Sequence, residues 1–170
     1  MQTLLGDILG WDGKSKDDIQ RVFQDHFEEI EFCKELVALL VETRTQVGAS
    51  WLLKHGLENK TVTLTGRQVT GVYQKVDKLE HWEAKLHILQ CFTFLPVPKS
   101  QADRVVAFLR SCLDDENKFV RAWAYNGFGE VARTHTQYSE EAQKVLKNGM
   151  KVESAASVKV RIRKALGAGV

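Results

Sequence analysis

One stretch near the middle of the chain decides the expected fold. Residues 114–132 read DDENKFVRAWAYNGFGEVA. An acidic turn comes first, and carboxylates are favourable at the start of a helix because they complement the helix dipole. Apolar and small residues then recur at helical spacing, and we expect Val120, Ala124, Gly127 and Phe128 to share the face that turns to the core. The stretch therefore predicts a turn followed by an amphipathic helix.

A similar helical segment recurs along the chain. Trp82, Val120 and Val158 follow one another at intervals of 38 residues, and each opens a segment with large, small and polar residues in the same order. A fourth such segment, 46–51, lies 35 residues before the one that begins near Trp82. Self-similarity at a period of 20–50 residues is typical of repeat proteins.

Each of these segments follows another amphipathic stretch, and one helix pair cannot bury its apolar face alone. Stacked pairs bury a continuous core instead. We therefore expect an all-α chain of about four stacked antiparallel helix pairs, forming a single domain over residues 1–170. The expected parts are a short capping helix at about 15–27 and repeats at about 28–58, 65–96, 100–134 and 138–168.

The stretch 114–132 resembles a HEAT repeat in its acidic turn and in the Val-Arg-x-x-Ala opening of its second helix, and residues 157–167 resemble the same helix. The resemblance covers roughly residues 30–168 and implies a right-handed α-solenoid of the HEAT, or armadillo-like, kind. Such arrays mostly act as protein-binding scaffolds, so the resemblance implies a non-enzymatic interaction module or adaptor. Gly48 departs from the pattern, since the family usually has a basic residue there, and marks the first repeat as a cap.

The charges are unevenly distributed. Residues 1–42 hold ten acidic and four basic side chains, whereas residues 143–170 hold seven basic side chains and one acidic one. The net charges are −6 and +6, although the whole chain carries only +2. The basic end is expected to bind an acidic partner, either a protein or the phosphates of a nucleic acid. The alternative is a solvated terminal face that keeps the array soluble.

Two large aromatic residues stand out beside these cations. Trp123 and Tyr125 occupy positions that hold Arg161 and Arg163 in the last repeat, and Trp and Tyr are favoured anchors of interfaces. Either could instead be buried by packing between neighbouring repeats. The candidate binding residues are Arg121, Trp123, Tyr125, Lys159, Arg161, Arg163 and Lys164.

Two other functions remain open. Basic second helices with interleaved Trp and Tyr also suit a phosphate backbone, and the repeat style is similar to that of DNA-alkylation-repeat glycosylases. Against DNA binding, the net charge is small and no catalytic Asp can be nominated. The second alternative is that the chain is a fragment or accessory subunit of a longer array, because Leu166–Val170 follow the last helix without a separate cap.

Signals for catalysis, metal and cofactor are weak. The sequence has no GxGxxG, P-loop or GxSxG motif, and its five histidines are scattered without metal-ligand spacing. We therefore expect no enzyme activity, no cofactor and no metal. No apolar run is long enough to span a membrane. Cys33, Cys91 and Cys112 are far apart and lie among apolar residues, which indicates buried free thiols in a cytoplasmic protein.

Overall fold

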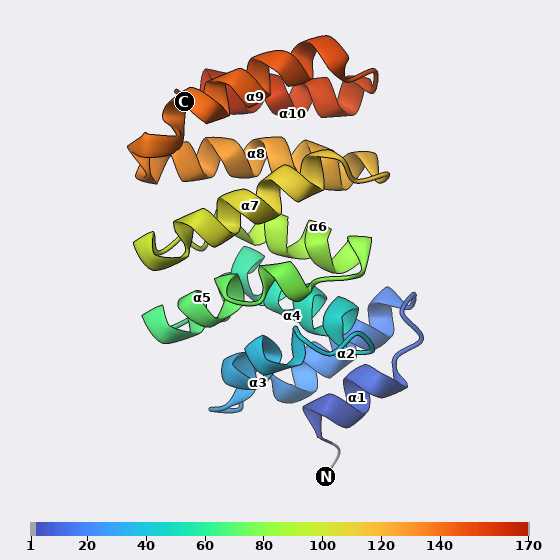
Figure 1. Ribbon diagram of the computed structural model, residues 1–170. Coiled ribbons are helices and arrows are strands. Elements are labelled where there is room, and N and C mark those ends of the chain that lie inside the picture. The colour runs from blue at the N-terminus through green and yellow to red at the C-terminus, as the bar shows by residue number, and fades with distance from the viewer. Residues whose placement is uncertain (1–2, 170) are drawn as a thin grey trace. The chain divides into compact units, whose positions relative to one another are not determined.

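The computed structural model describes residues 3–169, and the regular elements in this range are all helices (Figure 1). The expectation of an all-α chain is thus confirmed. Contacts divide the chain into two compact units, with the boundary between Phe94 and Leu95. Thr61–Leu64, the one stretch whose composition favours a strand, forms part of a loop.

The N-terminal unit is built from short helices with clear start signals. Ser15 caps the second helix by accepting a hydrogen bond from the Asp18 N–H at 3.2 Å. Thr65 and Gln68 form a reciprocal capping box at the start of the fifth. The helices are α1 (Leu4–Gly10), α2 (Lys16–His26), α3 (Phe32–Leu39), α4 (Gln46–Glu58), α5 (Gly66–Tyr73) and α6 (Trp82–Cys91), with a 3₁₀ turn η1 at Val76–Lys78.

The C-terminal unit contains the stretch that decided the fold. Asn117 caps the long helix of that stretch by accepting a hydrogen bond from the Phe119 N–H at 2.9 Å. This helix packs against the two α-helices that follow it in the chain. The elements are η2 (Lys99–Gln101), α7 (Ala102–Leu113), α8 (Lys118–Thr134), η3 (Thr136–Tyr138), α9 (Ser139–Val152) and α10 (Ala156–Gly167). Each of the four expected repeats therefore holds two α-helices.

The residues expected to face the core of the C-terminal unit do so. On α8 the buried set is Val120, Ala124, Gly127 and Phe128. On α10 it is Val158, Ile162 and Ala165, with Leu166 half-buried at the edge of the core.

The register assigned to Trp82 is wrong. The helices α4, α6, α8 and α10 begin at residues 46, 82, 118 and 156, at intervals of 36, 36 and 38 residues. Their third residues are Gly48, Ala84, Val120 and Val158, and all four are buried. Trp82 is the first residue of α6, and 42% of it is exposed. The sequence alignment paired the large apolar Trp82 with Val120. By helix position, the equivalent of Val120 is the small Ala84, two residues later.

Polar side chains join successive helix pairs within each unit. In the N-terminal unit, the buried Gln46 donates through Nε2 to Lys78 O at 2.8 Å and accepts at Oε1 from the Glu80 N–H at 2.9 Å. In the C-terminal unit, Arg110 on α7 donates through Nε to Glu141 Oε1 on α9 at 2.6 Å. These partners lie 31–34 residues apart in sequence, close to the length of one helix pair.

Helix α1 was not among the expected elements. Its side chains Leu4 and Ile8, four residues apart, are buried, and Thr3 caps its start. Ile8 rests on α4 where Gly48 has no side chain, because a Cβ built there would lie 2.8 Å from Ile8 Cγ2. The close approach of α1 therefore explains the glycine at this buried position, which by helix position corresponds to Val120 and not, as the sequence alignment had it, to the basic Arg121.

A buried histidine fixes α1 to α2. His26 is 4% exposed, its Nε2 lies 2.7 Å from Asp7 Oδ2 on α1, and its Nδ1 lies 2.7 Å from Glu29 Oε1. Burial opposes the charged imidazolium, but the hydrogen bonds to Asp7 and Glu29 outweigh it, so the pKa of His26 is raised. Only the protonated ring can donate to both carboxylates at once.

We predict that this bridge makes stability depend on pH. A raised folded-state pKa means that the bridge contributes fully below the unfolded-state pKa of about 6.5 and is lost as pH rises through the folded-state value. Urea denaturation midpoints of the wild type should therefore fall between neutral and alkaline pH more steeply than those of H26Q, which cannot titrate. Parallel curves for the two proteins would contradict the charged bridge.

Candidate functional site

Helix α10 has one buried face and one charged face. Val158, Ile162 and Ala165 bury themselves in the core shared with α8 and α9. On the opposite side Val160 is 46% exposed, and Arg163 and Lys164 are exposed. We call Lys159, Val160, Arg161, Arg163 and Lys164 the α10 surface.

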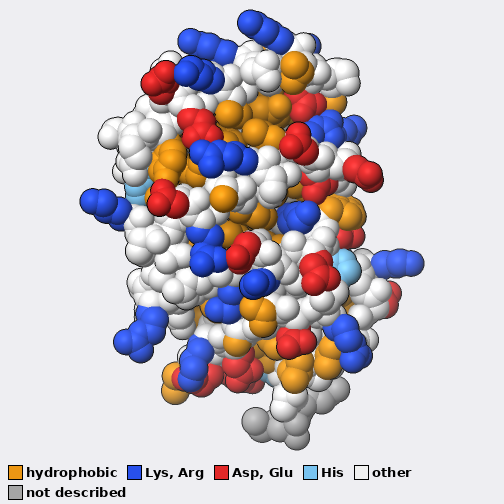
Figure 2. All heavy atoms as spheres, in the orientation of Figure 1, with side chains coloured by type: hydrophobic (Ala, Val, Ile, Leu, Met, Phe, Trp, Pro, Cys, Tyr) orange, Lys and Arg blue, Asp and Glu red, His pale blue; other side chains and the backbone are white. Residues whose placement is uncertain are grey.

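Val160 lies between two cations on this helix. Residues three and four apart are neighbours on a helix surface, so Arg163 and Lys164 flank Val160 on either side, one turn further along. In Figure 2, blue Lys and Arg side chains project over the α9–α10 end of the C-terminal unit. The arrangement offers a small apolar contact with cations beside it.

The cations of this end are largely without carboxylate partners. Among the described residues, Lys144 is paired with Glu140 at 2.8 Å, whereas Lys159, Arg163 and Lys164 have no carboxylate within ion-pair distance. Glu153 is the one acidic residue in 143–170. Its carboxylate is already used elsewhere, so the positive charge of the α10 surface is not neutralised by its neighbours in residues 3–169.

The structure brings together Arg161 and Trp123, two of the candidate binding residues. The guanidinium carbon of Arg161 lies 4.0 Å from the centroid of the Trp123 ring, and both side chains are half-buried. Such a cation–π contact contributes about 0.5–1 kcal/mol when exposed. It holds the arginine flat on the indole, so that α8 and α10 share one continuous surface at this point.

Arg121 is held inside the unit and does not extend freely into solvent. Its Nε and Nη2 donate to the two carboxylate oxygens of Glu153 at 2.9 and 3.2 Å, and Nη1 donates to the carbonyls of Asp115 and Glu116. The hydrogen bond to Glu153 raises the pKa of Arg121 above its usual value. The bridge links the start of α8 to the end of α9.

The expectation that Tyr125 is an exposed contact residue is wrong. Tyr125 is 4% exposed, and its hydroxyl lies 3.4 Å from Glu153 Oε1. Burial and the nearby carboxylate raise its pKa to about 12. Gly149 on α9 makes room for the ring, since a Cβ built there would lie 2.5 Å from Tyr125 Cε1. Neighbouring helices therefore bury Tyr125, whereas Arg163, its counterpart in the last helix pair, is exposed.

Sequence reasoning missed Glu153, Gly149 and Val160. Glu153 carried a signal, because it is the one acid among seven cations and follows Arg121 by 32 residues. Gly149 lies inside a helix, where glycine is unfavourable unless packing requires it. Val160 carried no signal of exposure in the sequence, since an apolar residue in a helix is usually assigned to the core.

Other kinds of site are not evident in the described residues. Among residues 3–169, no group of three or more His, Cys, Asp or Glu side chains is arranged to hold a metal ion. No helix in the same range is long and apolar enough to cross a membrane. Cys91 and Cys112 are buried free thiols and Cys33 is a half-buried one.

Comparison with known proteins adds no assignment. No protein-family model, curated protein or solved structure matches the chain. The resemblance to HEAT repeats therefore depends on the sequence pattern alone.

We predict that removing the Glu153 carboxylate destabilises the C-terminal unit. In E153A the guanidinium of Arg121 and the hydroxyl of Tyr125 lose an acceptor in a nearly closed site, where Glu153 is 7% exposed. The expected loss is about 1–3 kcal/mol of unfolding free energy, with a smaller loss for E153Q, which still accepts hydrogen bonds. Urea denaturation followed by circular dichroism measures it, and unchanged midpoints would show that solvent screens the pair.

A second prediction concerns Gly149. Alanine favours a helix over glycine by about 1 kcal/mol, yet G149A should lower the stability, because the added methyl meets the ring of Tyr125. Overpacking of this kind typically costs about 1–3 kcal/mol. The matched control is G167A, since a Cβ at that α10 position meets nothing within 4 Å. Thermal melting should place G149A below the wild type and G167A at or above it; the reverse order would contradict the packing.

Proposed function

We propose that the chain is a non-enzymatic protein-interaction module that binds an acidic protein segment on the α10 surface. The observation that carries the proposal is the lack of carboxylate partners for Lys159, Arg163 and Lys164 among the described residues. Holding uncompensated cations together on one helix is unfavourable for the free protein, and an acidic partner relieves that repulsion.

The mode of packing supports a repeat scaffold. Within each unit, helices that begin 36 or 38 residues apart bury equivalent positions, and side-chain hydrogen bonds join one helix pair to the next. We propose that these pairs are HEAT-like repeats of a right-handed α-solenoid. Arrays of this kind present their helices as binding surfaces, and α10 is the helix with the largest unpaired charge.

The mixed character of the surface favours a protein over a nucleic acid. Val160 offers an apolar contact between two cations, and protein interfaces combine apolar contacts with a polar rim. A nucleic-acid surface needs many phosphate contacts, but Arg121 is already bound to Glu153 and Arg161 lies on Trp123. The DNA-binding alternative thus has fewer free cations than the sequence predicted.

We predict that R163E/K164E binds acidic partners less well and keeps its fold. Both side chains are exposed, and surface substitutions usually change stability by no more than about 0.5 kcal/mol. Wild-type chain used as bait in cell extract should capture acidic proteins at about 0.1 M salt and release them near 1 M, where the screening length falls to roughly 3 Å. The double variant should fail to capture them.

The matched control is R67E/K78E, which changes the net charge equally at two exposed cations of the N-terminal unit. It should capture the same proteins as the wild type. If R163E/K164E and the wild type retain identical proteins at both salt concentrations, the proposal fails. If nuclease treatment removes the captured material, the binding is to nucleic acid and the protein-interaction proposal is overturned.

A further inference from the structure

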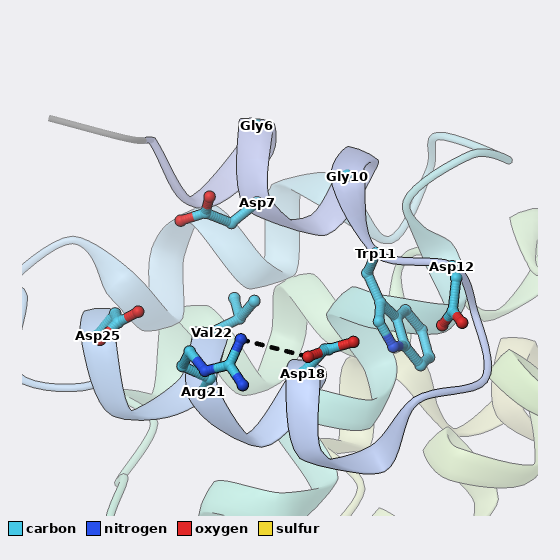
Figure 3. A pocket seen from close by; sticks show the side chains of 9 residues that line it. All are labelled: Gly6, Asp7, Gly10, Trp11, Asp12, Asp18, Arg21, Val22 and Asp25. Atoms are coloured by element: carbon cyan, nitrogen blue, oxygen red, sulfur yellow. Dashed lines mark ion pairs between the residues drawn. The ribbon is translucent and has the colours of Figure 1, made fainter.

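The N-terminal unit carries an acidic hollow between α1 and α2. Its volume is about 340 Å³, and Figure 3 shows its lining: the Arg21–Asp18 ion pair lies centrally, with Asp25 on one side and Trp11 and Asp12 on the other. Four carboxylates and one guanidinium line it, so its net charge is negative. Its remaining lining residues are Gly6, Asp7, Gly10 and Val22.

Part of this negative charge lacks a partner. Asp18 is 3.2 Å from Arg21, and Asp7 is bound by His26. Asp12 accepts two backbone N–H groups, which lower its pKa and keep it ionised. Asp25 in the hollow and Asp17, an exposed residue of α2, have no hydrogen-bond or ion-pair partner among residues 3–169.

Helix α1 also carries two exposed apolar side chains. Leu5 is 44% exposed and Leu9 is 38% exposed, and they share one face of α1 because they are four residues apart. Neither lines the hollow, which Gly6, Asp7 and Gly10 line from another face of this helix. Charge, and not apolar content, therefore matches the acids of this end to the α10 surface.

We infer that the acidic partner of the α10 surface is the exposed α2 surface formed by Asp17, Asp18 and Asp25 in a second copy of this chain. The inference rests on the proposed function and names its partner. Charge complementarity carries it: residues 1–42 have net charge −6 and residues 143–170 have net charge +6. Arg163 and Lys164 of one copy meet Asp25 and Asp17 of the next.

The contact is heterologous, because it joins different surfaces of two identical chains. Each copy keeps one acidic and one basic surface free, so association continues head to tail and forms open chains or closed rings. Interactions between exposed charges are screened at high ionic strength. The degree of association should therefore rise with protein concentration and fall as the salt concentration increases.

Sedimentation velocity of the purified full-length chain tests this. At low salt, the weight-average sedimentation coefficient of the wild type should rise with protein concentration, and near 1 M salt it should fall to the monomer value. R163E/K164E and D17K/D25K should each remain monomeric. A mixture of the two variants should associate, because the unchanged basic surface of one meets the unchanged acidic surface of the other.

R67E/K78E is the control for net charge and should assemble like the wild type. A wild type that stays monomeric at every concentration, or a mixture of variants that does not associate, overturns the inference. The pull-down with R163E/K164E distinguishes this from failure of the proposed function. If that variant loses acidic proteins from an extract while the wild type is monomeric, the α10 surface binds acids but not a second copy.

Discussion

The ion pair between Arg121 and Glu153 controls the organisation of the C-terminal unit. Glu153 binds the guanidinium through both oxygens and lies within reach of the buried hydroxyl of Tyr125. The same pair joins the start of α8 to the turn before α10, where the burial of Val158 begins. Since an ionised pair in a nearly closed site costs desolvation, it persists only with full hydrogen bonding, which the carbonyls of Asp115 and Glu116 complete for Arg121.

The pair also determines which charges remain available. By binding Arg121, it removes from the α10 end the one carboxylate in residues 143–170. Lys159, Arg163 and Lys164 are then left without a carboxylate partner in the described chain, while Arg161 rests on Trp123. A structural interaction inside the unit thus produces a charged surface outside it, and we propose that this surface is where a partner binds.

The all-helical fold was predictable from sequence because the helix start signals and the buried spacing agree. Ser15 and the Thr65–Gln68 pair are residue types that favour helix starts and do begin helices, and the buried face of α8 follows from its spacing. The register of α6 was not predictable, because Trp82 fitted the apolar pattern better than the small Ala84 that is buried. The exposure of Tyr125 was predicted wrongly for a related reason. Its burial depends on Gly149, in another helix, and the pattern within a single helix does not indicate such contacts.

The proposed function requires the α10 surface to bind carboxylates. Chemical-shift mapping of the ¹⁵N-labelled chain during titration with a poly-glutamate peptide tests this binding most directly. We expect salt-sensitive shifts of the backbone amides from Lys159 to Lys164 and of the Trp123 indole N–H, with little change around Arg121, which Glu153 already holds. Shifts confined to other helices, or no shifts at low salt, would contradict it.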